Sequence, residues 1–430
     1  MNVQLLKLVS IAAAPSRVIA GLMSGTSLDG LDIALCEFHG AGLDTQLKVL
    51  HFITMPYEED FKEELKAISF KDQADLQKVT LMNAKIGSYS AALIIKALSL
   101  WNFPVESVDL IASHGQTIFH APISLHHHAD WPNATLQIGD GDHIAQMTGV
   151  ITLSDFRQKH IAAGGEGAPL AVYGDYLLFS SVTENRILLN IGGIANFTYL
   201  PAGRNPDLVF STDAGPGNTL MDQFVQLHFP GKYFDKDAEI ARSGQVSTLL
   251  VEALLDNEFF SLPFPKTTGP ELFNMAYLDT AIANIEGKSS EINQTFSTLA
   301  TPSMISTSSS SSTFSMLSTF STLSKADILA SLCEFTALAI TNAIKKSVTD
   351  QSFKIYLSGG GMHNPLLTER ISKHLGVPLN NTADLGIDPD AKEAVLFALL
   401  ANECVSGGDT GYGSQSGMRE VTMGKISLPG

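Results

Sequence analysis

The stretch Arg17–Leu35, RVIAGLMSGTSLDGLDIAL, constrains the fold of this chain more than any other. An apolar run at 18–20 leads into a glycine, and Leu31, Ile33 and Leu35 alternate with polar or small residues, which is the period-2 pattern of a half-buried strand. Small and polar residues fill the segment between the two runs. The stretch therefore predicts two strands joined as a hairpin.

The hairpin loop, Ser24-Gly25-Thr26-Ser27, has the composition of a phosphate-binding loop. Glycine lets the backbone approach a ligand closely, and hydroxyl and N–H groups bind phosphate oxygens. Asp29 adds a carboxylate that could hold Mg²⁺ through water. Taken alone, the same residues also suit an ordinary Gly/Ser hairpin.

A second stretch, Arg186–Leu200, repeats this plan with Gly192 and Gly193 between two apolar runs, roughly 170 residues after the first. The repeat predicts two related α/β halves, which we place at 1–150 and 151–430. A Ser/Thr-rich segment at about 293–323 interrupts the second half, and its composition indicates a mobile insertion. Ser324 and Asp327 then form a capping-box pattern ahead of an apolar helix.

Polar residues follow several predicted strands, where ligands of open α/β sheets bind. These runs are 108–112 before His114 and Gln116, 149–154 before Asp155 and Arg157, and 209–212 before Asp213. His114 alone is equally compatible with a structural role, and Asp155 with an Asp–Arg pair that caps a turn. Two further glycine turns follow, at 214–218 (AGPGN) and 359–361 (GGG).

Composition narrows the classes of function. The chain has 430 residues and a formal net charge of −17, which opposes binding to nucleic acid or an anionic membrane. No apolar run approaches the roughly 20 residues of a membrane-spanning helix. Cys36, Cys333 and Cys404 lie far apart, so the expected compartment is the cytoplasm. A homodimer is left open.

Together, two glycine hairpins, acid-tipped strands and glycine turns suit phosphoryl transfer, which needs donors around the phosphates, a carboxylate for the metal and a base. The chain has no GxxxxGK[ST] motif and no GxGxxG turn followed by an acid. The residues therefore predict a two-lobed, Mg²⁺-dependent enzyme or binding protein that takes ATP and a small polar molecule.

The chain also resembles a known family. The motifs GLMSGTSLDGLDIAL, SHGQTIFH, TLQIGDG, SDFR, AAGGEGAPL, NIGGIANFTYL, DAGPGNTLMD, KTTGPELFN, YLSGGGMHN and LGIDPDAKEA, between residues 18 and about 402, are similar to those of anhydro-N-acetylmuramic acid kinases. The resemblance implies the two-lobed, actin-like (ribonuclease H-like) ATPase fold with a central cleft. It also implies that ATP and water convert 1,6-anhydro-N-acetylmuramic acid to N-acetylmuramic acid 6-phosphate in peptidoglycan recycling.

Carried over by motif, the resemblance assigns roles to single residues. Asp155 takes the catalytic position, and Asp29 and Asp213 fall on the metal side, holding Mg²⁺ through water. The expected ATP contacts are Gly25, Thr26, Ser27, Leu28, Asp29, Gly30, Leu31, Asp32, Gly192, Gly193, Asp213, Gly215, Gly217, Asn218, Gly359, Gly360 and Gly361. The expected sugar contacts are His114, Gln116, Arg157 and Glu271.

Three departures from the family pattern stand out: a long loop at 121–133, Ala214 where Thr is common, and the Ser/Thr-rich insertion. Two other functions stay open at this point. One is an ordinary sugar kinase that phosphorylates a free hydroxyl, and the other is an inactive relative that binds ATP or muramic sugars as a sensor. The acids Asp29, Asp155 and Asp213 argue against the sensor, since an inactive relative can lose them freely.

Overall fold

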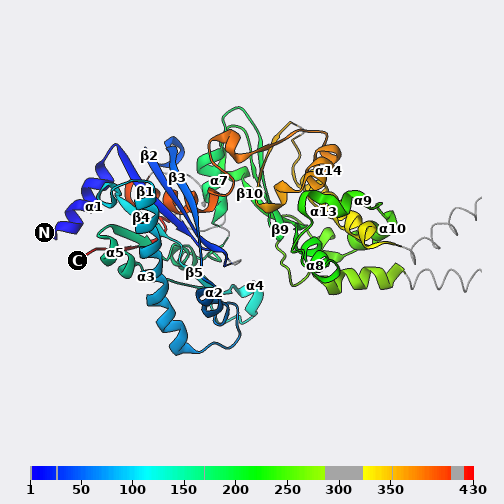
Figure 1. Ribbon diagram of the computed structural model, residues 1–430. Coiled ribbons are helices and arrows are strands. Elements are labelled where there is room, and N and C mark those ends of the chain that lie inside the picture. The colour runs from blue at the N-terminus through cyan, green and yellow to red at the C-terminus, as the bar shows by residue number, and fades with distance from the viewer. Residues whose placement is uncertain (1, 26–27, 169, 286–322, 351, 408–420) are drawn as a thin grey trace, which may run out of the picture. The chain divides into compact units, whose positions relative to one another are not determined.

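The computed structural model describes residues 2–25, 28–168, 170–285, 323–350, 352–407 and 421–430 (Figure 1). The expected insertion at 293–323 lies outside the described residues except for Leu323. The chain divides into two compact units. Unit 1 comprises Met1–Val182, Ala202–Val209 and Ala383–Gly430, and unit 2 comprises Thr183–Pro201 and Phe210–Thr382.

Unit 1 is built on a six-stranded sheet of order β13-β7-β4-β1-β2-β3 and a separate β5-β6 ribbon. Strands β1, β2 and β3 form an antiparallel meander, and β4 and β7 run parallel to β1. Its strands are β1 (Ser16–Met23), β2 (Gly30–His39), β3 (Gln46–Pro56), β4 (Leu110–Ser113), β5 (Gln116–Ala121), β6 (Ala134–Ile138), β7 (Ile151–Ser154) and β13 (Lys425–Ser427). Its helices are α1 (Val3–Ala13), α2 (Glu59–Lys66), α3 (Leu76–Leu100), α4 (Ile123–His126), α5 (Gly141–Thr148), α6 (Arg157–Ala162), α7 (Ala171–Phe179) and α15 (Lys392–Ser406).

Helices cover both faces of this sheet. Ala20 and Leu22 of β1 join a core that includes buried side chains of α3. Gly21 points to the other face, where a Cβ atom would lie 1.9 Å from the carbonyl oxygen of Ala394 in α15. Successive residues of a strand face opposite sides, so α3 and α15 lie on opposite faces. Burial on both sides explains the continuous apolar runs of the central parallel strands.

Unit 2 repeats the same plan. Its five-stranded sheet has the order β10-β9-β8-β11-β12, with β8, β9 and β10 as an antiparallel meander and β11 parallel to both β8 and β12. Its strands are β8 (Arg186–Ile191), β9 (Ile194–Leu200), β10 (Phe210–Pro216), β11 (Lys354–Ser358) and β12 (Leu379–Asn381). Its helices are α8 (Thr219–His228), α9 (Glu239–Ser243), α10 (Thr248–Leu255), α13 (Lys325–Ser347) and α14 (Pro365–Leu375), and residues 275–285 are also helical.

The shared strand order confirms the predicted actin-like α/β class with two related halves. The expected hairpins are β1–β2 and β8–β9. The predicted capping box is present at the start of α13, where the Ser324 and Asp327 side chains each accept from the other residue's backbone N–H. Helix α13 is long and apolar enough to cross a membrane, but most of it is buried inside unit 2.

The division into units differs from the expected boundary after residue 150. β7 follows that point but pairs with β4 in the sheet of unit 1. The chain also returns to unit 1 at residue 383, and α15 packs on β1. A linear boundary cannot describe this arrangement, because the last helix of the chain covers the first sheet.

Candidate active site

Three parallel strands of unit 1 end at one edge of the sheet. Leu22 of β1 pairs with Ser113 of β4, which in turn pairs with Ser154 of β7. The segments that follow carry the hairpin loop, His114 and Asp155. The fold therefore brings together, within unit 1, residues that the sequence placed at separate strand ends.

Gln116 ties the hairpin loop to this edge. Ser24 Oγ donates a hydrogen bond to Gln116 Oε1 over 2.6 Å, and Gln116 Nε2 donates to the carbonyl of Gly25 over 3.3 Å. Gln116 is buried. Its observed role is thus to fix the loop, and its expected contact with sugar stays a prediction. Thr26 and Ser27 lie outside the described residues.

The residues after the loop are partly explained by packing. A Cβ atom at Gly30 would lie 2.5 Å from the carbonyl oxygen of Met55 on β3, so β3 already requires glycine there. Leu28 and Leu31 are buried in the core of unit 1. These three residues offer a ligand only their backbone groups.

Asp32 lies near the carboxylates of Asp390 and Asp29 in unit 1. Its carboxylate accepts a hydrogen bond from Thr54 Oγ1 over 2.6 Å. Burial raises the pKa of Asp32, the Thr54 bond opposes that shift, and the carboxylates of Asp390 and Asp29 add to it. A cation near this group would be stabilised by several carboxylates at once.

His114, which is buried, and Arg157, which is partly buried, form a pair at the same edge. Arg157 Nε donates to His114 Nε2 over 3.1 Å, and Arg157 Nη1 donates to the carbonyl of Gly167 over 2.8 Å. The His114 proton is therefore on Nδ1, which donates to the carbonyl of Gly115 over 3.0 Å. Burial, then the charge of Arg157, lowers the pKa of His114 to about 3. His114 is neutral at pH 7 and orients Arg157.

Asp155 follows β7 directly and adopts a left-handed backbone conformation, with φ of 52°. This conformation is uncommon for residues other than glycine, and aspartate is among the side chains that tolerate it best. The carboxylate contacts the ammonium group of Lys425 on β13. The alternative of an Asp155–Arg157 pair is not what the structure shows, because Arg157 donates to His114 and Gly167 instead.

Unit 2 gathers its own predicted loops at one place. The N–H groups of Gly217 and Asn218 donate to the carbonyls of Gly193 and Gly192, both over 2.8 Å. A Cβ atom at Gly217 would lie 2.2 Å from the Gly192 carbonyl oxygen, so only glycine allows this approach. The β8–β9 hairpin and the turn after β10 are thus joined by backbone hydrogen bonds that use the N–H groups of Gly217 and Asn218.

The glycine triplet after β11 packs on the end of β8. Cβ atoms at Gly359 and Gly361 would lie 2.6 Å from Asn190 Oδ1 and 2.3 Å from Ile191 Cγ2. Gly360 has more space, with Asn218 Nδ2 at 3.9 Å from its Cβ position. Packing therefore explains two of the three glycines, and contact with adenosine stays a prediction for this loop.

Asp213 lies inside β10, at a bulge between Asp213 and Gly215, rather than at the strand end that the sequence predicted. Its Oδ2 accepts a hydrogen bond from the N–H of Thr268 over 2.8 Å. Burial raises the pKa of Asp213 to about 6; the Thr268 bond opposes this shift and the nearby Glu271 carboxylate adds to it. Glu271 is exposed.

The predicted sugar contacts are divided between the two units. His114, Gln116 and Arg157 belong to unit 1, and Glu271 belongs to unit 2. Sequence reasoning also missed two charged residues of unit 1. Glu393, in the first turn of α15, interacts electrostatically with Arg157, and Lys425 contacts Asp155. The DPDAKEA motif contains Glu393 without indicating its partner, and nothing near Lys425 in the sequence points to Asp155.

A direct metal cage is absent from the described part of the chain, where no group of three or more His, Cys, Asp or Glu side chains is placed to hold an ion. Asp29 and Asp213 are hard oxygen donors, however, and Mg²⁺ keeps several waters when it binds with nucleotide phosphates. Each of these two carboxylates, taken within its own unit, thus suits a hydrated Mg²⁺ that is held through water.

The chain is similar in sequence to proteins of one known family. A family model described as anhydro-N-acetylmuramic acid kinase matches residues 17–317 and 311–428. A protein of that name from Pseudoalteromonas atlantica is 48% identical over 433 residues, covering 100% of both chains. Another from Caldanaerobacter subterraneus is 36% identical over 427 residues, covering 98% of this chain and 100% of the relative.

Similar solved structures are much more distant. The activator of 2-hydroxyisocaproyl-CoA dehydratase from Clostridium difficile, with bound ADPNP, has a TM-score of 0.40 and 9% identity, covering 94% of this chain and 99% of its own. A ROK family glucokinase from Streptomyces griseus, in complex with glucose and AMPPNP, has a TM-score of 0.32 and 10% identity, covering 89% and 97%.

Proposed function

The chain belongs to the anhydro-N-acetylmuramic acid kinase family, and from this premise we propose that it converts 1,6-anhydro-N-acetylmuramic acid, ATP and water to N-acetylmuramic acid 6-phosphate and ADP. The reaction serves peptidoglycan recycling. One observation supports this chemistry most. The ends of β4 and β7 are aligned in the sheet of unit 1, so Asp155, which follows β7, and the His114–Arg157 pair lie at the same edge.

Asp155 is the general base in this proposal. Water attacks the anomeric carbon and gives its proton to the Asp155 carboxylate, while the bond from that carbon to O6 breaks and O6 bonds to the γ-phosphorus. The bond between that phosphorus and the bridging oxygen of ADP breaks at the same time. A positioned base contributes roughly 10²–10⁴ in rate. The Lys425 ammonium contacts one carboxylate oxygen of Asp155, so in this proposal the other oxygen takes the proton from water.

Arg157 and Glu271 are proposed to position the sugar. His114, which is neutral, accepts from Arg157 Nε and so fixes the plane of the guanidinium. A planar, fixed guanidinium suits two-point recognition of a carboxylate, and the lactyl carboxylate of a muramic acid is such a group. Glu271 is exposed near Asp213 and offers acceptors for sugar hydroxyls.

The backbone loops of both units are proposed to bind ATP phosphates. In unit 1 this is the loop at 24–29, and in unit 2 it is the surface formed by Gly192, Gly193, Gly217 and Asn218. Mg²⁺, held through water by Asp29 and Asp213, would neutralise phosphate charge. We also propose a cytoplasmic location, since the three cysteines are free thiols in the structure.

Product analysis tests the reaction. The full-length protein is incubated with ATP, Mg²⁺ and anhydro-N-acetylmuramic acid, and the sugar product is identified by mass spectrometry. A gain of one phosphate and one water supports the proposal. A gain of phosphate alone identifies an ordinary sugar kinase, and sugar binding without turnover identifies a sensor; either result overturns the proposed reaction.

A further inference from the structure

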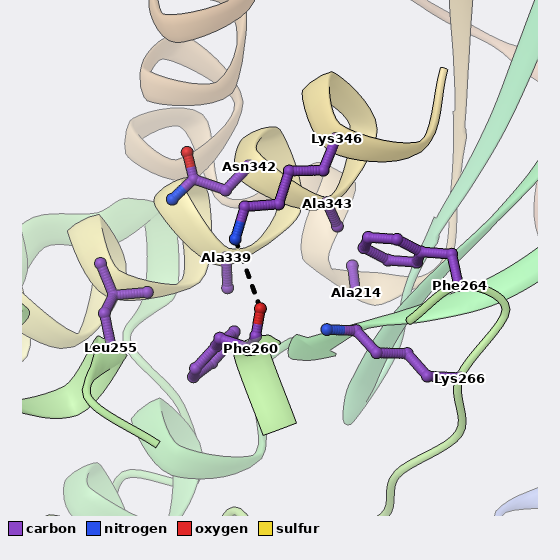
Figure 2. A pocket seen from close by; sticks show the side chains of 9 residues that line it. All are labelled: Ala214, Leu255, Phe260, Phe264, Lys266, Ala339, Asn342, Ala343 and Lys346. Atoms are coloured by element: carbon purple, nitrogen blue, oxygen red, sulfur yellow. Dashed lines mark hydrogen bonds between the residues drawn. The ribbon is translucent and has the colours of Figure 1, made fainter. Parts of the chain in front are cut away.

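Unit 2 contains a cavity of about 150 Å³ next to β10 (Figure 2), and Gly215, one of the expected ATP contacts, packs against its lining residues Phe260 and Ala339. It is bounded by β10, α10, the turn η5 (Glu258–Ser261), the segment that follows η5, and α13. The lining residues are Ala214, Leu255, Phe260, Phe264, Lys266, Ala339, Asn342, Ala343 and Lys346. Most of the wall is therefore apolar, and both charged side chains are lysines.

Two ammonium groups approach this cavity, and neither has a carboxylate partner in the part of the chain that the structure describes. Lys266 Nζ donates to the carbonyl of Phe259 over 2.7 Å, and Lys346 Nζ donates to the carbonyl of Phe260 over 3.3 Å. Figure 2 shows both groups pointing toward the space beside Phe260. Neither lysine has an ion pair among residues 2–25, 28–168, 170–285, 323–350, 352–407 and 421–430.

The Lys266 charge is costly where it lies. The residue is 8% exposed, and its Nζ is 4.2 Å and 4.7 Å from the ring centroids of Phe259 and Phe264. The rings and the carbonyl partly compensate the charge. A buried charge without a counter-ion remains unfavourable, and the two lysines repel each other. Burial, then the charge of Lys346, lowers the pKa of Lys266.

We propose that this cavity is a binding site for a small monocarboxylate with an aromatic or branched apolar body. The carboxylate would sit between the two ammonium groups, and the body would fill the space lined by Leu255, Phe260 and the alanines. A cavity near 150 Å³ accepts a benzene-sized group.

Hydrogen bonds donated by main-chain N–H groups connect the segment of Lys266 to Thr212 and Asp213 of β10. The N–H of Lys266 donates to Thr212 Oγ1 over 3.0 Å, and the N–H of Asp213 donates to the Lys266 carbonyl over 2.9 Å. Two residues beyond Lys266, Thr268 holds the Asp213 carboxylate. A carboxylate that moves Lys266 therefore moves the segment between Asp213 and Glu271. Any change in turnover caused by this movement rests on the proposed function. Binding of the carboxylate to the cavity does not.

Benzoate is the test probe, with neutral benzamide as its matched control. Calorimetric titration of the full-length protein is expected to show saturable benzoate binding, at least tenfold tighter than benzamide. Ala343→Leu fills the cavity without changing charge and is expected to abolish binding. Lys346→Met removes one ammonium group and should weaken benzoate at least fivefold, while Lys345→Met, an exposed neighbour on α13 that does not line the cavity, should have no effect.

The binding result is independent of kinase activity. Absence of saturable binding, equal affinity for benzamide, or binding unaffected by both Ala343→Leu and Lys346→Met would overturn the site. Lys266 itself is left unchanged, since its removal could unfold unit 2. If benzoate binds as expected and the protein makes no phosphorylated sugar, the proposed function fails while the binding site stands.

Discussion

The ammonium group of Lys425 contacts a carboxylate oxygen of Asp155, although 270 residues separate them along the chain. Strand β13 creates this contact by pairing with β7, so that Lys425 lies opposite Ser154. The Lys425 side chain is 63% exposed. Exposed ion pairs of this kind contribute about 0–1 kcal/mol to stability. The contact therefore orients Asp155 more than it stabilises unit 1.

Two variants distinguish a catalytic role of Asp155 from a structural role in its ion pair with Lys425. Asp155→Asn is expected to lower kcat by roughly 10²–10⁴, because the base is lost. Lys425→Met should lower kcat less than about fivefold, because only an exposed pair is lost. Both variants are followed by ADP release and by thermal unfolding. Equal losses of kcat in the two variants would show that Asp155 acts only by holding β13.

His114→Gln is expected to change how stability depends on pH. The pKa of His114 is lowered to about 3 from 6.5 in the folded protein, so this group's contribution is complete above pH 6.5 and is lost as pH falls toward 3. The loss approaches about 1.4 kcal/mol per pH unit between these limits. Gln keeps an acceptor for Arg157 and does not titrate. Urea unfolding at pH 7 and pH 5 should therefore show a smaller acid loss in the variant; an unchanged slope would mean that His114 titrates normally.

Asp213→Asn is expected to raise the free energy of unfolding at pH 7 and to raise the KM for Mg-ATP. The folded state raises the pKa of Asp213 from 3.8 to about 6, so it binds the proton more tightly than the unfolded chain. Stability from this group is present below about pH 4 and is lost as pH rises through 6. Removing the charge should add on the order of 1–2 kcal/mol at pH 7, discounted for partial exposure, and nothing at pH 4.

The control for this prediction is Asp222→Asn. Burial likewise raises the pKa of Asp222 to about 6, and the same gain in stability is expected there. The two variants are expected to differ in their KM for Mg-ATP. Asp213→Asn should raise this KM while sugar binding measured without nucleotide survives, and Asp222→Asn should not raise it. Loss of sugar affinity instead would place Asp213 on the sugar side.

Gly21→Ala is expected to destabilise unit 1 severely. The added Cβ would lie 1.9 Å from the Ala394 carbonyl oxygen, which belongs to the backbone of α15 and cannot move aside cheaply. Gly376→Ala is the control, since its Cβ meets no atom within 4 Å and it carries only the strain of a left-handed conformation, about 1–2 kcal/mol. Circular dichroism during heating measures both. Similar melting temperatures would mean that α15 packs less closely on β1.

Local pattern was enough to predict much of this structure. Both hairpins, the strand before Asp155 and the capping box at Ser324 arise from neighbouring residues, and all are present. The strand edge of unit 1 was also predictable, since parallel strands align their carboxyl ends.

The features that the sequence could not predict depend on contacts between residues far apart in the chain. The partners of Asp155 and Arg157 are set by sheet order and helix packing, which place Lys425 and His114 beside them. The boundary near residue 150 was wrong for the same reason, because nothing in the sequence of α15 shows which sheet that helix covers. The bulge at Asp213 was missed because a run of strand-forming residues does not reveal where the ladder shifts.

The return of the chain to unit 1 has a consequence for biosynthesis. A ribosome makes every residue of unit 2 before it makes α15, whereas domains usually fold in the order of their synthesis. After β7 has been made, roughly 240 residues, more than half of the chain, emerge before α15 can cover one apolar face of the first sheet. Unit 2 can therefore fold before unit 1 is complete, and unit 1 gains the helix that covers this face of its sheet only after α15 has been made.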